Sequence, residues 1–233
     1  MTRFRSLASL DKALIKCERC PRLVAWREEV AEVKRKAYKD EVYWGKPVPG
    51  FGVSDPKILV VGLAPGAHGA NRTGRIFTGD SSGDWLYRAL HKNSLASIPT
   101  SRSRDDGQEL IDTRITCAVH CAPPDNKPST EERDACGEWF IRELELTYPK
   151  LRSIVALGAF AWDAVLRTLK TRFEVVGKPP RFAHGAEFEW KDEDGNSRLL
   201  IGSYHPSQQN TFTGKLTEAM LDRVFARASR FAR

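Results

Sequence analysis

Long hydrophobic runs are missing from this sequence of 233 residues. No apolar segment approaches the roughly 20 residues that a membrane-spanning helix needs, and the N-terminus lacks the uninterrupted apolar core of a secretory signal. Internal repeats and low-complexity tracts are also absent. We therefore expect a soluble, cytoplasmic protein that works as a monomer and has no membrane partner.

Cysteine is scarce, with five residues, and structural disulfides are not expected inside cells. The CxxC pair of Cys17 and Cys20 is by itself consistent with redox chemistry, with zinc or with no function. Cys121 closes a predicted strand and Cys136 lies just inside a predicted helix, so the loop between them could turn both thiolates inward. Two such pairs could form one site, although spacing alone does not distinguish zinc from an iron–sulfur cluster. Cys117 is left as the odd cysteine.

Positive charge exceeds negative charge. The 37 Lys and Arg residues outnumber the 30 Asp and Glu residues, which gives a formal net charge of +7. Such an excess suits a polyanionic partner, because Lys and Arg near phosphates release counterions. Charge alone does not identify that partner.

Apolar runs alternate with helical patterns along the chain. This alternation predicts a three-layer αβα sandwich with a central, mainly parallel sheet of about four strands, in one domain over residues 1–233. Ligands of such sheets bind outside the carboxyl ends of the strands. The Ser-, Arg- and Asp-rich segment 97–109 is predicted to be exposed. Strands are expected at 58–61, 113–121, 153–158, 182–190 and 198–205, and helices at 6–36 with a break at 17–21, after 80, from 129 to 149, at 159–169 and at 216–231.

A glycine-rich loop follows the first strand. Between Gly62 and Asp80 the chain holds five glycines, a density that allows close approach of backbone amides to a ligand. One interpretation is an ordinary connection between a strand and a helix. A nucleotide site is the second, but the loop lacks the Lys-Ser/Thr ending of a P-loop and the compact dinucleotide spacing.

The third interpretation of this loop is a resemblance. GLAPGAHGANRTGRIFTGD resembles the first motif of the uracil-DNA glycosylases, in particular family 5, the type B enzymes. CAPPDNKPS and SYHPSQQNTFTGKLT resemble two further segments of that family, and the similarity spans most of residues 17–220. The resemblance implies an enzyme that flips uracil from DNA and hydrolyses its glycosidic bond to leave an abasic site. Hypoxanthine and xanthine are plausible further substrates, and strand cleavage is not expected because no lysine is placed as a Schiff-base nucleophile.

The same resemblance assigns the cysteines. Families 4 and 5 carry an N-terminal CxxC and a later pair that together hold a four-iron four-sulfur cluster, and Cys17, Cys20, Cys121 and Cys136 match those positions. The cluster would tie the N-terminal helix to the loop that carries Asn126. Its expected role is structural, and the alternative is a set of buried free thiols.

Four side chains are candidates for the chemistry. His205 would donate a hydrogen bond to uracil O2, Asn126 would read the base edge or position water, and Phe77 would stack on the base. Asp80 would orient water or stabilise the sugar cation. Each also has a structural alternative. His205 could be a core or surface histidine, and Asn126 a turn former. Phe77 could be a core aromatic, and Asp80 a helix N-cap.

One departure concerns the polar residue that several families place two positions after the first glycine of motif one. Here that position is Ala64, a loss shared with family 5, which makes Asp80 the best remaining candidate. Together with Phe77, Asn126 and His205, the residues expected to surround the base are Gly62, Ala64, Pro65, Gly66 and Ser207.

Two rival functions stay open. A non-catalytic member would bind uracil-DNA or sense redox state through its cluster. A zinc-containing hydrolase on a similar α/β sheet is the other rival. DNA with deaminated bases is the expected partner of the enzyme, which would then associate with the nucleoid.

Overall fold

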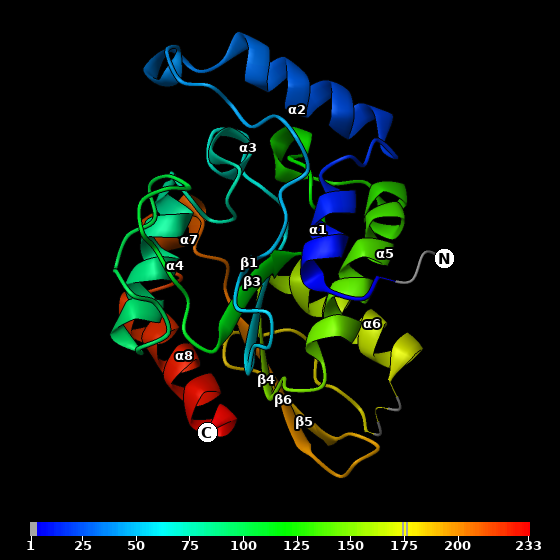
Figure 1. The fold of residues 1–233 in the computed structure, drawn as a ribbon. Coiled ribbons are helices and arrows are strands. Elements are labelled where there is room, and N and C mark those ends of the chain that lie inside the picture. The colour runs from blue at the N-terminus through cyan, green and yellow to red at the C-terminus, as the bar shows by residue number, and fades with distance from the viewer. Residues whose placement is uncertain (1–3, 174, 176) are drawn as a thin grey trace.

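A six-stranded sheet forms the middle layer of the protein (Figure 1). The computed structural model describes residues 4–173, 175 and 177–233. Within them the strands lie in the order β1-β3-β2-β4-β6-β5. Their bounds are β1 Phe51–Gly52, β2 Ile58–Gly62, β3 Thr113–Cys117, β4 Ser153–Leu157, β5 Glu187–Lys191 and β6 Ser197–Ser203.

The predicted αβα architecture is confirmed. The four inner strands β3, β2, β4 and β6 are parallel, and the edge strands β1 and β5 are antiparallel to their neighbours. The six strands exceed the predicted number of about four. The edge strand β5 lies largely in the segment predicted as a strand at 182–190, whereas β1 was not predicted, because its two residues are too few to show a periodicity in the sequence.

Helices cover both faces of the sheet (Figure 1). Helices α4 and α8 pack on one face, α5 and α6 pack on the other, and α1 lies against α5. Helix α2 crosses the end of the sheet where the parallel strands terminate, beside α3. The helices are α1 Leu7–Leu14, α2 Pro21–Val33, α3 Ala70–Thr73, α4 Ser81–Lys92, α5 Thr130–Thr147, α6 Ala159–Arg172, α7 Gln208–Phe212 and α8 Glu218–Ala232, with 3-10 turns at Lys36–Tyr38 and Pro124–Asn126. In the part of the chain that the structure describes, none of them is long and apolar enough to cross a membrane.

The sheet has apolar layers on both faces, and the central strand β2 contributes to both. Every residue of β2 is buried. Ile58 and Val60 join the layer that includes α4 and α8, whereas Leu59 and Val61 join the layer that includes α5 and α6. A strand buried on both faces therefore appears in the sequence as an unbroken apolar run.

Segment 97–109 is less exposed than predicted. Ser101 and Gln108 are buried, because the segment folds back on the glycine-rich loop. Arg75 of that loop donates to Ser101 Oγ at 2.7 Å and to both carboxylate oxygens of Asp106. Polar composition alone does not reveal that Arg75 forms hydrogen bonds with Ser101 and Asp106.

A buried ion pair joins the central sheet to α5. Arg114 in β3 and Glu143 in α5 are 4% and 2% exposed, and Arg114 Nε donates to Glu143 Oε1 at 2.5 Å. Thr116 Oγ1 donates to the other carboxylate oxygen, and Asp11 of α1 lies 3.2 Å from Arg114 Nη2. Each charge of the pair therefore has an oppositely charged, hydrogen-bonded partner although both side chains are buried.

Replacing Glu143 by Gln should lower the free energy of unfolding by about 3–5 kcal/mol, since the buried Arg114 guanidinium would lose its buried carboxylate partner and keep only the partly exposed Asp11. Urea unfolding measures this loss. Glu138→Gln is the matched control on the same helix: its ion pair with Arg19 is nearly half exposed on both sides, and its loss should cost less than about 1 kcal/mol. Equal losses in the two variants would contradict the assignment.

Candidate active site

The glycine-rich loop returns to the end of β2 and places Phe77 there. Phe77 has a φ of 50°, an uncommon backbone conformation for a bulky residue that costs on the order of 1–3 kcal/mol. Its ring lies against Gly62, where an added Cβ would be 2.8 Å from Phe77 Cε2. Any side chain at Gly62 would displace the ring, so the glycine is required for this contact.

Asp80 caps helix α4 and also reaches back into the loop. Its Oδ1 accepts a hydrogen bond from the Gly83 backbone N–H at 3.0 Å. Its Oδ2 lies against Gly69, where a Cβ would come within 1.9 Å of it. Burial raises the pKa of Asp80. Asp80 therefore acts as the N-cap of α4 through Oδ1, while its Oδ2 is directed into the loop.

His205 follows β6 and faces Phe77. The two ring centroids are 5.7 Å apart, with the planes tilted by 32°. Burial lowers the pKa of His205 to about 4, so the imidazole is neutral at pH 7 and carries one N–H donor. Asn210 Nδ2 donates to the His205 carbonyl at 2.9 Å and fixes the segment. The structure therefore brings Phe77, Asp80 and His205 to the carboxyl end of the sheet.

Asn126 is not brought into contact with these three side chains within the described residues. It lies on the exposed 3-10 turn after β3, and both Asp125 and Asn126 have left-handed φ values, 52° and 56°. Asn126 therefore serves as a turn residue, which was its structural alternative. The prediction that its amide meets a base stays a prediction.

The other residues expected around the base lie at the same strand ends. Pro65 is buried and Gly66 half-buried beside Asp80 Oδ2. Ala64 packs against the apolar cluster that contains Cys121 and Cys136. Ser207 is half-buried and directly precedes α7. The first motif thus contacts both the candidate site and the cysteines.

The four cysteines of the predicted cluster line one small cavity. Cys17 and Cys20 are half-buried, and Cys121 and Cys136 are buried. As placed, the described residues include no set of three or more His, Cys, Asp or Glu side chains that could hold a metal ion. Yet the sulfurs of Cys121 and Cys136 each accept an N–H hydrogen bond, from Arg27 Nη1 at 3.1 Å and from the His120 backbone at 3.2 Å. Four thiols on one cavity with donors aimed at sulfur fit a thiolate-bound cofactor.

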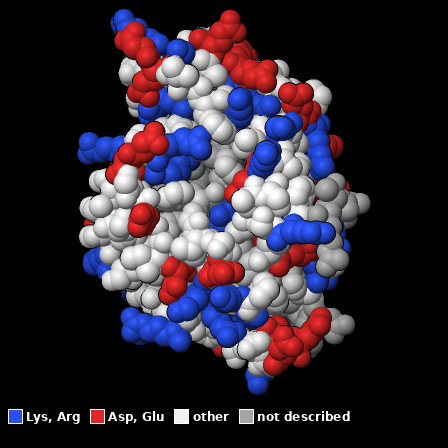
Figure 2. All heavy atoms as spheres, viewed as in Figure 1, with Lys and Arg blue, Asp and Glu red and all other residues white. Residues whose placement is uncertain are grey.

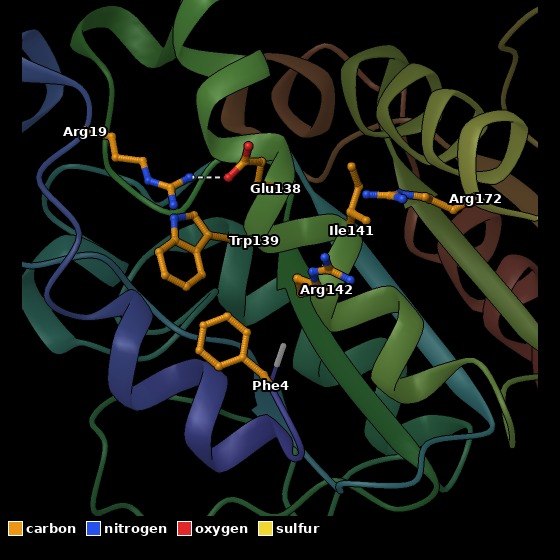
Figure 3. Close-up of a pocket in the computed structure, with 7 residues that line it drawn as sticks. All are labelled: Phe4, Arg19, Glu138, Trp139, Ile141, Arg142 and Arg172. Atoms are coloured by element: carbon orange, nitrogen blue, oxygen red, sulfur yellow. Dashed lines mark hydrogen bonds and ion pairs between the residues drawn. The ribbon is translucent and has the colours of Figure 1, made fainter. Parts of the chain in front are cut away.

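A larger cavity of about 210 Å³ is also lined by Trp139 (Figure 3). Trp139 and Arg19 line both cavities, with the Arg19 guanidinium 5.0 Å from the Trp139 ring centroid and paired with Glu138. Phe4 packs on the same indole at 5.8 Å. Of the side chains that line this larger cavity, only Arg19 lies within a predicted motif, between Cys17 and Cys20.

Two buried arginines of the loop were missed by the sequence analysis. Arg72 donates to the carbonyls of His68 at 2.7 Å and Gly79 at 2.8 Å, and so joins the two ends of the loop. Arg75 ties the loop to segment 97–109, as described above. Arginines within a glycine-rich stretch were the available signal, because a loop without a hydrophobic core needs side-chain donors to fix it.

Surface charge does not by itself outline a DNA-binding face. Figure 2 shows Lys and Arg interspersed with Asp and Glu on the face seen in Figure 1, with acidic side chains along the top over α2. The net charge of +7 is thus not concentrated in one continuous patch on this face.

Comparison with known proteins decides the family. The family model described as "Uracil DNA glycosylase superfamily" matches residues 49–229. The chain belongs to this superfamily. It is 51% identical to the type-5 uracil-DNA glycosylase of Mycobacterium leprae over 97% of this chain and 96% of that protein. The type-5 uracil-DNA glycosylase of Thermus thermophilus is 48% identical over 95% of this chain and 96% of that protein.

More distant members of the superfamily also match. The type-4 uracil-DNA glycosylase of Archaeoglobus fulgidus is 30% identical over 69% of this chain and 70% of that protein. The higher identity to type-5 proteins agrees with the family 5 resemblance of the first motif, and the predicted family is confirmed.

The low pKa of His205 in this superfamily member should make stability depend on pH. Between pH 4 and about 6.5 the unfolded chain binds more protons at this residue than the folded chain, so its contribution is complete above pH 6.5 and is lost as pH falls towards 4. His205→Gln should therefore lose less unfolding free energy between pH 7 and pH 5 than the unchanged protein. Urea unfolding at both pH values tests this, with exposed His91→Gln as control. The same pH dependence in His205→Gln would contradict the expectation.

Proposed function

We propose that the chain is a DNA repair glycosylase that flips uracil out of DNA and hydrolyses its N-glycosidic bond, leaving an abasic site. Two kinds of observation support this function. The superfamily model covers residues 49–229, and relatives named type-5 uracil-DNA glycosylase share about half of the sequence. The observation that carries the mechanism is the contact of the Phe77 ring with the His205 ring, with Asp80 three residues beyond Phe77 in the same loop.

His205 supplies the donor for the leaving group. Cleavage of the glycosidic bond places negative charge on the departing uracil, and a fixed N–H aimed at its O2 stabilises that charge as it develops. Because burial lowers the pKa of His205 to about 4, the residue acts as a neutral donor at pH 7. Phe77, held in a strained conformation beside it, offers a ring face on which the flipped base stacks.

Asp80 acts on the sugar side of the bond. In its ionised form the carboxylate can orient a water molecule or stabilise the positive charge that develops on the sugar. One carboxylate oxygen is fixed by the Gly83 N–H, so the other keeps a defined position against Gly69. Asn126, on its exposed turn, would complete base recognition when DNA is bound.

The substrate range and reaction type follow from the same residues. Ala64 replaces a polar side chain in motif one, which leaves room for bases other than uracil, and hypoxanthine and xanthine are the candidates. The proposed mechanism uses hydrolysis without a lysine nucleophile, so strand cleavage is not expected. The enzyme would act as a monomer on deaminated DNA at the nucleoid.

A four-iron four-sulfur cluster is the proposed cofactor, held by Cys17, Cys20, Cys121 and Cys136. Support comes from their shared cavity and from the N–H donors that face two of the sulfurs. Bound there, the cluster would cross-link α2 to the segment between β3 and α5. The chain's own contribution includes Trp139 and Arg19, which line both the cysteine cavity and the neighbouring cavity.

Uracil release tests the function directly. Asp80→Asn keeps an oxygen for the Gly83 N–H but removes the carboxylate, so release from a uracil oligonucleotide should fall about 100-fold or more while the unfolding free energy changes by less than about 1 kcal/mol. Ser6→Ala is the control: it removes the N-cap of α1, costs about 1 kcal/mol and leaves release unchanged. If the unchanged protein released neither uracil nor hypoxanthine nor xanthine, the proposed glycosylase activity would be wrong. A non-catalytic DNA-binding protein would then be favoured.

Iron and sulfide analysis tests the cofactor. The purified protein should be brown, with about four iron atoms per chain, and Cys121→Ser should lower the iron content and the thermal stability. Cys117→Ser is the control, because Cys117 is buried but lies outside the cysteine cavity. A colourless, zinc-loaded protein would contradict the cluster and favour a zinc hydrolase.

A further inference from the structure

Arg27 of α2 contacts the cysteine cavity through its side chain. The side chain is 3% exposed, and Nη1 donates to Cys121 Sγ and to the Cys17 carbonyl, both at 3.1 Å. Its charged neighbour on the same helix, Glu28, is 3.7 Å away and 58% exposed. A buried guanidinium stays protonated and needs a compensating negative charge close by. Thiolates that hold the proposed cluster would supply that charge.

The backbone of the same residue contacts the glycine-rich loop. Asn71 Nδ2 donates to the Arg27 carbonyl oxygen at 3.2 Å. Asn71 is fully buried, its backbone N–H donates to the Gly66 carbonyl, and its own carbonyl accepts from the Gly45 N–H. One asparagine therefore fixes α3 to α2 and, through Gly66, to the part of the loop that surrounds Asp80 Oδ2.

The two contacts leave polar atoms without partners among the described residues. Arg27 Nε and Asn71 Oδ1 are both buried and form no hydrogen bond there. Buried polar atoms of this kind are uncommon and each costs stability. Hydrogen bonding within the chain therefore does not fully satisfy Arg27 and Asn71.

We propose that Arg27 and Asn71 are positioning residues that couple the cysteine site to the glycine-rich loop; the effect on uracil release rests on the proposed function. Loss of the cluster would leave the Arg27 guanidinium without a buried anion beside it, and α2 would shift to relieve this. Because the Arg27 carbonyl belongs to the same residue, that shift breaks the contact with Asn71. The glycine-rich loop, which places Phe77 and Asp80, then loses its hydrogen bond to α2. Coupling of this kind acts in both directions.

Asn71→Asp tests the loop side of the link in the cluster-loaded protein. The substitution preserves shape but removes the donor to the Arg27 carbonyl. We expect unchanged iron content, faster hydrogen exchange at the amides of residues 71–74 and a fall in kcat of about tenfold with little change in KM. Asn93→Asp is the matched control, because Asn93 Nδ2 donates to the Ala89 carbonyl at the far end of α4.

Arg27→Met tests the cysteine side. It should lower iron retention and also accelerate exchange at residues 71–74, whereas exchange in α8 stays as in the unchanged protein. Removing iron from the unchanged protein with a chelator should also accelerate exchange at residues 71–74. This measurement tests the proposal even if a variant fails to fold. Iron loss without faster exchange in the loop, or Asn71→Asp with unchanged exchange, would overturn the proposal. A protein without glycosylase activity would remove only the kcat comparison, so failure of the function is distinguishable.

Discussion

The absence of side chains at three glycines allows the candidate site to form. Gly62 leaves room for the Phe77 ring, Gly69 for the Asp80 carboxylate, and Gly83 for the Phe77 carbonyl, which would lie 2.1 Å from an added Cβ. These contacts press the loop against both the end of β2 and the first turn of α4. The glycines thus determine where the aromatic ring and the carboxylate lie, although they carry no chemical group themselves.

Polar side chains of the loop itself hold it in place. Arg72 joins His68 to Gly79, Arg75 fastens the loop to segment 97–109, and Asn71 ties it to α2. Such bonds are formed mostly with backbone carbonyls, which a loop leaves unpaired. The strained φ of Phe77 is then stabilised by its surroundings, as is typical of residues placed for function.

Local patterns predicted most of the fold. The apolar runs of β2 and β4 and the mixed segment of β3 were all predicted as strands, and Asp80 was recognised as a candidate helix N-cap. Short elements such as β1 and α7 escaped, because two to five residues show no periodicity.

The site was predictable where a motif carries its own geometry. Phe77 and Asp80 belong to one loop, and the resemblance located His205 opposite them, which the ring contact at 5.7 Å agrees with. The buried roles of Arg27 and Asn71 could not be predicted, since each depends on a partner tens of residues away along the chain. Asn126 shows the reverse case, with a strong motif but no contact to the other site residues within the described chain.

A crystal structure of the protein bound to duplex DNA with a non-cleavable uracil nucleotide would test the central claim most directly. The account predicts the uracil outside the helix, stacked on the Phe77 ring, with its O2 accepting a hydrogen bond from His205 and the Asp80 carboxylate facing the sugar. A uracil that is bound elsewhere, or a base in this position that contacts neither Phe77 nor His205, would contradict it.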